Sequence, residues 1–248
     1  GQLYDREQLV ALARLCVEHN LWVVSDEAYR ELLYTGAETV SVWGLSERDV
    51  PGITGRRISI ESTSKVWNAC GLRVGALITD NEEFHTRAVA EYTANLCANA
   101  IGQHVFAGLL EESPAALRQW FTRQRLYYQD LIQKTHAEMR RLRPGIIVSA
   151  PQASIYSVVA VRGLVGPAFD VLPFVLYCAR EGAVDVGGQR YTLLTAPMSG
   201  FYDTAAGEPN PGRTQVRIAY VPPPEEMRLV PRLFAELLER FLGRPSGR

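Results

Sequence analysis

The sequence predicts an α/β fold in which a mostly parallel sheet is followed by a smaller C-terminal α/β domain. Residues 5–20 carry apolar side chains at helical spacing, and residues 21–25 then form a short, nearly continuous apolar run. The strands of a parallel sheet are buried on both faces and therefore read as continuous apolar runs. A helix followed by such a run is typical of the second half of a βαβ unit. A second run of this kind covers residues 57–61. The strand that should precede the first helix is absent, so we expect the sequence to begin within a domain.

Each further element of the first domain follows from a local pattern. Asp5 is placed to cap the first helix, and Leu9, Leu12, Ala13 and Cys16 recur at helical spacing as its buried face. After the second strand we expect a strand at residues 72–79 broken by Gly75, a helix at 81–97 with Phe84, Ala88 and Tyr92 on one face, an interruption at 95–100, and further helix at 101–110.

The boundary between the two domains is expected near residue 113, which gives domains 1–113 and 114–248. Ser113-Pro114 begins a long helix that reaches about residue 143, and proline suits the first helical turn because no N–H is needed there. Later elements are expected as strands at 145–150, 154–161 and 214–221, a helix at 169–182, and an amphipathic helix at 225–242. Residues 197–211 are rich in Gly, Pro and Asn, which is typical of a long functional loop.

Composition and charge exclude two classes of partner. The chain has 248 residues, 47% hydrophobic and 21% charged, and a net charge of −1. It has neither a basic surplus nor an apolar run of about 18 residues, so nucleic acid and membranes are not expected partners. The four cysteines lack metal-ligand spacing, so we expect free thiols, no metal site and a cytoplasmic location.

Lys65 is the first candidate for chemistry. The chain contains 24 arginines but only two lysines, Lys65 and Lys134. Arginine stays protonated, whereas a desolvated lysine can lose its proton and attack a carbonyl carbon to form a Schiff base. A loop lysine paired with a carboxylate is the alternative that this residue alone would favour.

Other polar residues follow the two predicted strands. Ligands of open α/β sheets bind beyond the carboxyl ends of the strands, so these side chains are expected to meet in one crevice. For Asp26 alone, a helix cap is the structural alternative. Taken together, the groups predict a site for an anionic, aromatic ligand that carries a carbonyl group. The residues concerned are Asp26, Tyr29, Ser62, Ser64, Lys65 and Arg73.

Three motifs resemble those of the class I/II aminotransferases, the aspartate-aminotransferase-like enzymes of fold type I. Ser62-x-Ser64-Lys65, followed by Gly-Leu-Arg-Val-Gly at 71–75, is similar to the family's pyridoxal-phosphate attachment signature. Asp-Glu-Ala-Tyr at 26–29 resembles its Asp-x-x-Tyr, and Val-Arg-Ile-Ala-Tyr at 216–220 resembles the strand with its carboxylate-binding arginine. The match covers essentially the whole chain, but only the later part of the family's usual length.

The resemblance implies that pyridoxal 5′-phosphate (PLP) is the cofactor. Lys65 would form the internal aldimine and act as the base that moves the Cα proton. Asp26 would pair with the pyridinium nitrogen, and Tyr29 would donate to the phenolic oxygen of the ring. The phosphate would be held by Ser62, Ser64 and Arg73.

Arg217 is implied to bind the α-carboxylate of the substrate. Val216 and Ile218 flank it and point to the opposite side of the predicted strand, so the pattern alone also allows a solvent-facing arginine. Arg213 and Arg190 are the competing candidates for this role.

A loop near residues 93–99 approaches the partner subunit's active site in the resembled family. Thr93, Asn95 and Asn99 are therefore candidate substrate contacts, with surface or capping roles as the alternative. Trp67 and Cys70, which lie within the attachment motif, are expected to be packing residues.

Two segments depart from the family pattern and leave the substrate open. Residues 151–156 (Pro-Gln-Ala-Ser-Ile-Tyr) lack the glycine of Pro-x-Gly-Ala-Phe-Tyr, and residues 196–202 replace the segment near Pro-Gly-x-x-Phe-Gly. The family's earlier motifs are missing, and Gly1 would fit the end of its Asn-Pro-Thr-Gly. We expect a fragment, or one piece of a cut enzyme, whose N-terminal part is a polypeptide of roughly 150 residues, a common domain size.

The implied function is an aminotransferase that moves an amino group between an amino acid and a 2-oxo acid, typically as a homodimer. PLP-dependent elimination, replacement or cyclisation uses the same residues and stays open as an alternative. A non-catalytic module of the same fold is the third possibility, and the presence of Lys65, Asp26, Tyr29 and Arg217 argues against it.

Overall fold

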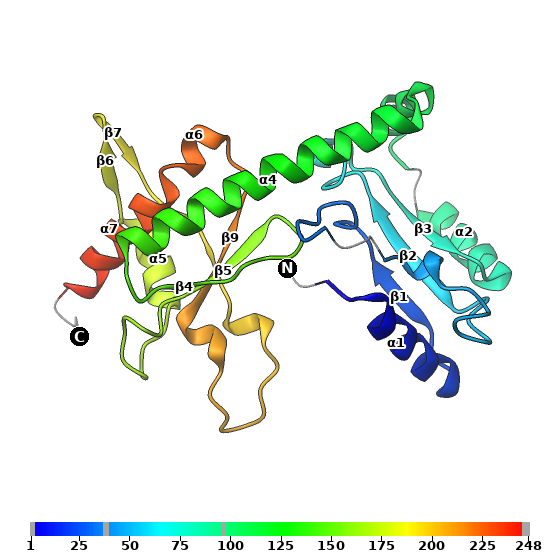
Figure 1. Cartoon of the computed structure of the whole chain (residues 1–248), viewed down its shortest axis with the longest axis horizontal. Helices are drawn as coiled ribbons and strands as arrows, with labels where there is room; N and C mark the ends of the chain where they lie inside the picture. The colour runs from blue at the N-terminus through cyan, green and yellow to red at the C-terminus, as the bar shows by residue number, and fades with distance from the viewer. Residues whose placement is uncertain (1–2, 37–39, 96–97, 245–248) are drawn as a thin grey trace. The chain divides into compact units, whose positions relative to one another are not determined.

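The computed structural model describes residues 3–36, 40–95 and 98–244, which form two compact units (Figure 1). The first unit runs to Arg125 and includes Gln152–Ser154. The second contains Leu126–Pro151 and the chain from Ile155 onward. The division falls inside the long helix α4 (Pro114–Leu142), so this helix contributes residues to both units. A domain boundary at residue 113 stays a prediction.

The first unit is built on a three-stranded sheet of order β1-β2-β3, seen side by side in Figure 1. The strands are β1 (Val23–Asp26), β2 (Arg57–Ser62) and β3 (Gly75–Thr79). β1 and β2 are parallel, as expected, but β3 is antiparallel to β2. Residues 63–74 join β2 to β3 through turns and a short 3-10 helix, η2 (Cys70–Leu72). Because that link contains no crossover helix, the chain returns antiparallel.

Only one face of this sheet is well covered by the described residues. Helix α1 (Arg6–Glu18) and residues 42–53, which include η1 (Val42–Gly44), pack against Val23. On the other face, Val24, Ile60 and Leu77 are 60%, 39% and 56% exposed. The prediction of strands buried on both faces was therefore wrong for the described residues, because their apolar run alternates between a covered and an uncovered side.

The caps and faces of the first helices follow the sequence in part. Asp5 caps α1 as expected, since its carboxylate accepts from the Gln8 amide at 2.8 Å. Ala13 and Cys16 are buried, but Leu12 is 45% exposed, so the predicted apolar face of this helix was too wide.

Two shorter helices lead to α4. α2 (Glu82–Asn95) covers most of the range predicted as helix, 81–97, and Tyr92, expected on its packed face, is exposed. The interruption expected at residues 95–100 is confirmed at its described ends, while Leu96 and Cys97 lie outside the described residues. α3 (Ala100–Ala107) is shorter than predicted because the chain tightens into the 3-10 helix η3 (Gly108–Glu111).

The second unit contains a four-stranded antiparallel sheet of order β4-β5-β9-β8. Three strands fall in the predicted regions: β4 (Ile147–Val148), β5 (Tyr156–Ala160) and β9 (Gln215–Ala219). Helix α5 (Leu172–Arg180) was also predicted. β8 (Ala196–Pro197) and the hairpin of β6 (Val184–Val186) and β7 (Gln189–Tyr191) were not. The long segment after β8 contains two 3-10 helices, η4 (Ser199–Phe201) and η5 (Pro211–Thr214).

The closing helix was predicted as one element but is two, α6 (Pro224–Met227) and α7 (Val230–Leu242). Pro231 accounts for the break, because it has no N–H to donate to the carbonyl of Met227 four residues earlier and its ring clashes with that group. The amphipathic stripe of α7 is confirmed. Its buried residues include Val230, Leu233, Phe234, Leu237 and Leu238. Across the described ranges, no helix is both long and apolar enough to pass through a bilayer.

Candidate active site

The two parallel strands of the first unit bring Asp26 and Ser62 to the same edge of the sheet. Asp26 is the last residue of β1 and Ser62 the last of β2, and the register sets Asp26 beside Ile60. The Asp26 side chain is exposed and accepts one hydrogen bond, from the Ala28 amide at 3.1 Å. This edge is therefore a place where a carboxylate and a hydroxyl can meet a ligand.

Glu27 follows Asp26 but turns into the protein, where it is only 5% exposed. Its carboxylate accepts from Arg30 at 2.8 Å, from the Ser41 hydroxyl at 2.8 Å and from the Val42 amide at 3.1 Å. Arg30 also bonds Glu61 at 2.8 Å. The first acid of the pair faces outward, while the second is committed to a structural network.

Lys65 lies on a loop that Thr63 holds closed. The buried Thr63 hydroxyl lies 3.2 Å from the Ala69 carbonyl oxygen and 3.0 Å from that of Val74. Its amide donates to Val74 O at 3.1 Å, and its carbonyl accepts from the Ala69 amide at 3.1 Å. Thr63 occupies the variable position of the Ser-x-Ser-Lys motif, so the motif gave no signal of its role.

The two lysines have different surroundings. Lys134 forms an ion pair with Asp130 at 2.7 Å along α4. The half-buried Lys65 side chain has no hydrogen bond or ion pair with any described residue. The alternative of a loop lysine paired with a carboxylate therefore applies to Lys134 and not to Lys65, as far as the described residues go.

Arg73 and the two serines line the same loop. The Ser62 hydroxyl accepts from the Ser64 amide at 3.1 Å. Arg73 adopts a left-handed conformation, with φ of 53°, and its exposed guanidinium donates to the Cys70 carbonyl at 2.9 Å. No described carboxylate pairs with Arg73, so most of its donors remain for an anion.

Tyr29 lies in the turn that follows β1 and is half-buried, with its carbonyl accepting from the Leu32 amide at 2.9 Å. Trp67 is a packing residue as predicted, since its ring lies 5.7 Å from that of Phe106 and 4.9 Å from that of Phe121. The Cys70 thiol, by contrast, is exposed, so its predicted packing role was wrong.

Asn99 serves as a cap. Its side chain accepts from the Gly102 amide at 3.1 Å at the start of α3 and donates to the Leu72 carbonyl at 2.8 Å. A Cβ on Gly102 would lie 2.5 Å from that same carbonyl oxygen, so only glycine allows the helix to approach the loop so closely. The Thr93 hydroxyl donates to the Val89 carbonyl at 2.7 Å, which is a helix-surface role.

Arg217 belongs to the second unit, on β9. Its neighbours Val216 and Ile218 are buried, as the alternation predicts, and its guanidinium stacks on the rings of Tyr156 at 4.5 Å and Phe201 at 4.9 Å. No described carboxylate pairs with it, whereas Arg213 lies 3.4 Å from Asp170. The stacking fixes the guanidinium plane and leaves its N–H groups for an acid.

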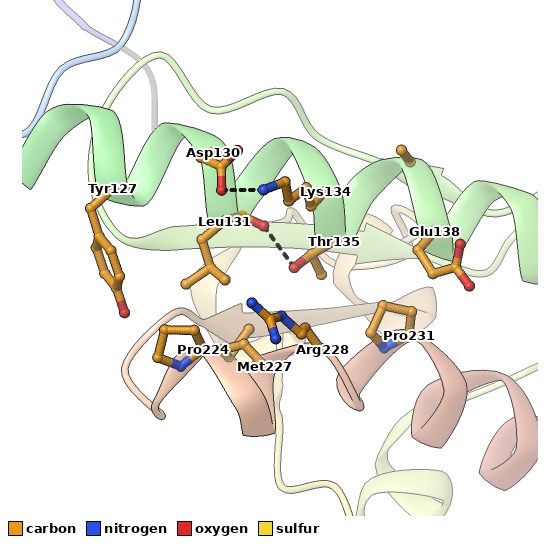
Figure 2. A pocket seen from close by; sticks show the side chains of 11 residues that line it. Tyr127, Asp130, Leu131, Lys134, Thr135, Glu138, Pro224, Met227, Arg228 and Pro231 are labelled. Carbon is orange, nitrogen blue, oxygen red and sulfur yellow. Dashed lines mark hydrogen bonds and ion pairs between the residues drawn. The ribbon is translucent and has the colours of Figure 1, made fainter.

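The groove shown in Figure 2 contains none of the predicted site residues. It has a volume of about 570 Å³, and α4 and residues 224–231 form its walls. Its Lys134 and Glu138 are already paired, with Asp130 and Arg141 respectively. The chemistry therefore concentrates on the loop and strand ends around Lys65.

Comparisons with known proteins agree with this geometry. Residues 1–188 match the family model for "Aminotransferase class I and II". The chain is 32% identical to kynurenine–oxoglutarate transaminase 3 of Rattus norvegicus over 102 residues, 41% of this chain and 21% of that protein. It is 27% identical to an aspartate aminotransferase of Streptomyces avermitilis over 170 residues, 67% of this chain and 38% of that protein.

Solved structures give the fold along nearly the whole chain. Alpha-aminoadipate aminotransferase LysN from Thermus thermophilus superposes with a TM-score of 0.73 at 22% identity, covering 98% of this chain and 56% of that one. An aromatic aminotransferase from Pyrococcus horikoshii gives 0.75 at 20% identity, covering 97% and 57%. This chain belongs to the class I and II aminotransferase family and has its fold type I architecture. It spans little more than half the length of these structures.

Proposed function

We propose that this chain carries the cofactor lysine of a PLP-dependent aminotransferase, which moves an amino group between an amino acid and a 2-oxo acid. The observation that carries the proposal is the Lys65 side chain, unpaired among the described residues, on a loop closed by Thr63 beside Asp26 and Ser62. The relatives named above are aminotransferases, which does not favour elimination, replacement or cyclisation.

The donor set fits PLP, a phosphorylated aldehyde. Lys65 supplies an amine for the aldehyde, and Ser62, Ser64 and Arg73 supply hydroxyls and a guanidinium for the phosphate. Bound PLP supplies an electron sink for the substrate's Cα carbanion. The exposed Asp26 carboxylate would hold a proton on the pyridine nitrogen, and the Tyr29 hydroxyl would donate to the phenolic oxygen.

The proton and the substrate would be handled by two further groups. The Lys65 amine would accept the proton from the substrate Cα and deliver it to the cofactor carbon that takes up the amino group, which is general acid–base catalysis by a positioned amine. Arg217, whose guanidinium stacks on two aromatic rings, would bind the α-carboxylate and so set the orientation of the Cα–H bond.

The same proposal includes a missing N-terminal part, a homodimer and a cytoplasmic location. The chain covers little over half of its structural relatives, and Val24, Ile60 and Leu77 form an apolar sheet face that further chain would cover. Cys16 and Cys178 are buried free thiols, which suits a reducing compartment. Intact mass analysis of the native protein tests the missing part, and finding no companion or longer polypeptide contradicts it.

The decisive test compares the two lysines. The native protein, incubated with PLP and an amino donor, should give a pyridoxamine spectrum and a released 2-oxo acid. Lys65→Ala should lower the rate by at least about 10²–10⁴-fold, since the positioned base is lost. Lys134→Ala, which removes only an exposed ion pair, should match the parent. Equal rates in both variants would contradict the role of Lys65.

A further inference from the structure

A second pocket lies directly behind the Lys65 loop, within the first unit. Its volume is about 340 Å³, within the range of small-molecule sites. The loop itself forms one wall through Trp67, Ala69 and Leu72. The opposite walls come from α3, η3 and the first turns of α4, and include Phe106, Leu117 and Trp120.

The rim of this apolar pocket carries one acid and one base, Glu112 and Arg123. Both are exposed, and neither side chain has a hydrogen bond or ion pair with any described residue. The groove of Figure 2 differs in this respect, because its two acids, Asp130 and Glu138, already have basic partners among the described residues. Two unpaired charges of opposite sign beside an aromatic cavity are complementary to a zwitterion with an apolar side chain.

We propose that this pocket is a second binding site, for a free apolar or aromatic amino acid, and that its occupancy alters the Lys65 loop. Arg123 would bind the carboxylate and Glu112 the ammonium group, while the side chain enters between Trp67 and Trp120. Binding does not depend on the proposed function. Only the consequence for amino transfer rests on it.

The connection to Lys65 runs through its neighbours in the chain. The Trp120 indole N–H donates to the carbonyl of Val66, the residue after Lys65, over a long 3.4 Å. Trp67, two residues after Lys65, makes ring contacts with Phe106 and Phe121. A side chain placed between the two tryptophans would shift both of these contacts and with them the position of the lysine.

Binding is tested by titrating the native protein, without added PLP, with L-phenylalanine and following tryptophan fluorescence, since Trp67 and Trp120 line the pocket. We expect a saturable change. Arg123→Gln and Glu112→Gln should each weaken it about tenfold, the loss of one charge-assisted hydrogen bond. Arg118→Gln, an exposed arginine of the same helix outside the pocket, is the matched control and should bind as the parent does.

A ligand analogue and a variant that fills the pocket with a larger side chain distinguish binding at this site from binding at the substrate site. 3-Phenylpropionate lacks the ammonium group, so its binding should be insensitive to Glu112→Gln, and Ala116→Phe should abolish binding of both ligands. Arg217→Gln should leave the titration unchanged. A signal that is lost in Arg217→Gln and retained in Arg123→Gln would assign the binding to the substrate site and overturn the proposal.

The effect on the loop is read without catalysis. An excess of an amine-reactive reagent labels Lys65 and Lys134, and peptide mass analysis gives their ratio. L-Phenylalanine should change the ratio at least twofold in the parent and not in Ala116→Phe, with Lys134 as internal reference. Saturable binding with an unchanged ratio would refute the coupling, and no saturable binding would refute the site, whatever the outcome of the transamination test.

Discussion

Polar side chains cluster at the strand ends of the first unit and in a buried cluster of the second unit. The two clusters differ in how exposed their side chains are and in whether these side chains bond one another. At the strand ends, Asp26 and Arg73 are exposed, and Lys65 has no partner among the described residues. In the second unit, His136 Nε2 lies 2.8 Å from the Ser157 hydroxyl and 3.0 Å from that of Tyr220, which donates to Ser157 at 2.9 Å. All three are buried.

Burial also shifts the pKa values of two groups in the buried cluster. Burial, with a smaller contribution from Arg140, lowers the pKa of His136 to about 4, and burial raises the pKa of Tyr220 to about 12. Both groups stay neutral near pH 7. A histidine, serine and tyrosine within hydrogen-bonding distance look like catalytic machinery, yet here they satisfy one another and are closed to substrate. Unpaired polar groups, and not polar groups in general, mark the candidate site.

The sharpest test of this comparison uses the adjacent acids Asp26 and Glu27. Asp26→Asn should lower the rate of amino transfer by about 10²–10³-fold, the usual cost of removing one electrostatic partner of a reacting system, with little change in stability. Glu27→Gln should do the converse and lower the free energy of unfolding by about 1–3 kcal/mol, because Arg30 loses a charged partner. Activity assays and urea denaturation of both variants measure the amino-transfer rate and the free energy of unfolding. Similar losses of both quantities in the two variants would contradict the distinction between the outward and the inward acid.

The buried cluster should appear in the pH dependence of stability. The pKa of His136 is lower in the folded chain than the ordinary value of about 6.5, so the unfolded state binds the extra proton. Stability should therefore fall as the pH drops from about 6.5 towards 4, by about 3 kcal/mol in all. Denaturation curves at pH 7 and 4.5 test this.

Two histidine variants control for the other titrating groups. His136→Asn should flatten the pH dependence above pH 4.5, whereas substitution of the exposed His19 by Asn should leave it unchanged. The same slope in all three chains would show that the carboxylates, and not His136, set it.

Substitution of Thr63 is expected to have the smallest effect, a change in the free energy of unfolding that depends on one hydroxyl group. Thr63 belongs to the buried, hydrogen-bonded class but lies within the candidate site. Thr63→Val keeps the shape and removes the donor to Ala69 and Val74, so we expect a loss of about 1–2 kcal/mol in the free energy of unfolding. Thr63→Ser retains the hydroxyl and should recover most of it. Hydrogen exchange of the Lys65 loop should rise in the valine variant alone.

The sequence predicted the elements that depend on a short stretch of residues, such as a helix cap or a run of regular apolar spacing. The Asp5 cap, the parallel pair β1–β2, the long helix α4 and the alternation around Arg217 all follow from periodicity or end residues. The antiparallel return of β3, the split at Pro231 and the β6–β7 hairpin depend on short links, where a few turn residues decide direction. Leu12 and Val24 are apolar yet exposed. Their exposure was not predicted, because apolar periodicity identifies one face of an element but does not show whether another element covers that face.

The candidate site was predictable as a set of motif residues but not as a network. The family is confirmed by the match over residues 1–188, while the roles of Lys65, Asp26, Tyr29, Ser62, Ser64, Arg73 and Arg217 stay predictions. Thr63 and Glu27 were missed because their importance comes from burial and hydrogen bonding, which a single sequence does not display.

The outward Asp26 and inward Glu27 also constrain how genes for this chain can change. Side chains alternate along β1, so a one-codon insertion within it would move Asp26 to the inward position of Glu27, and a one-codon deletion would move Glu27 to the outward position of Asp26. The insertion would place the shorter carboxylate in the cavity lined by Arg30, Ser41 and Val42. The deletion would place the longer carboxylate at the ligand edge. We therefore expect the length of this strand to be held constant by purifying selection against single-codon insertions and deletions.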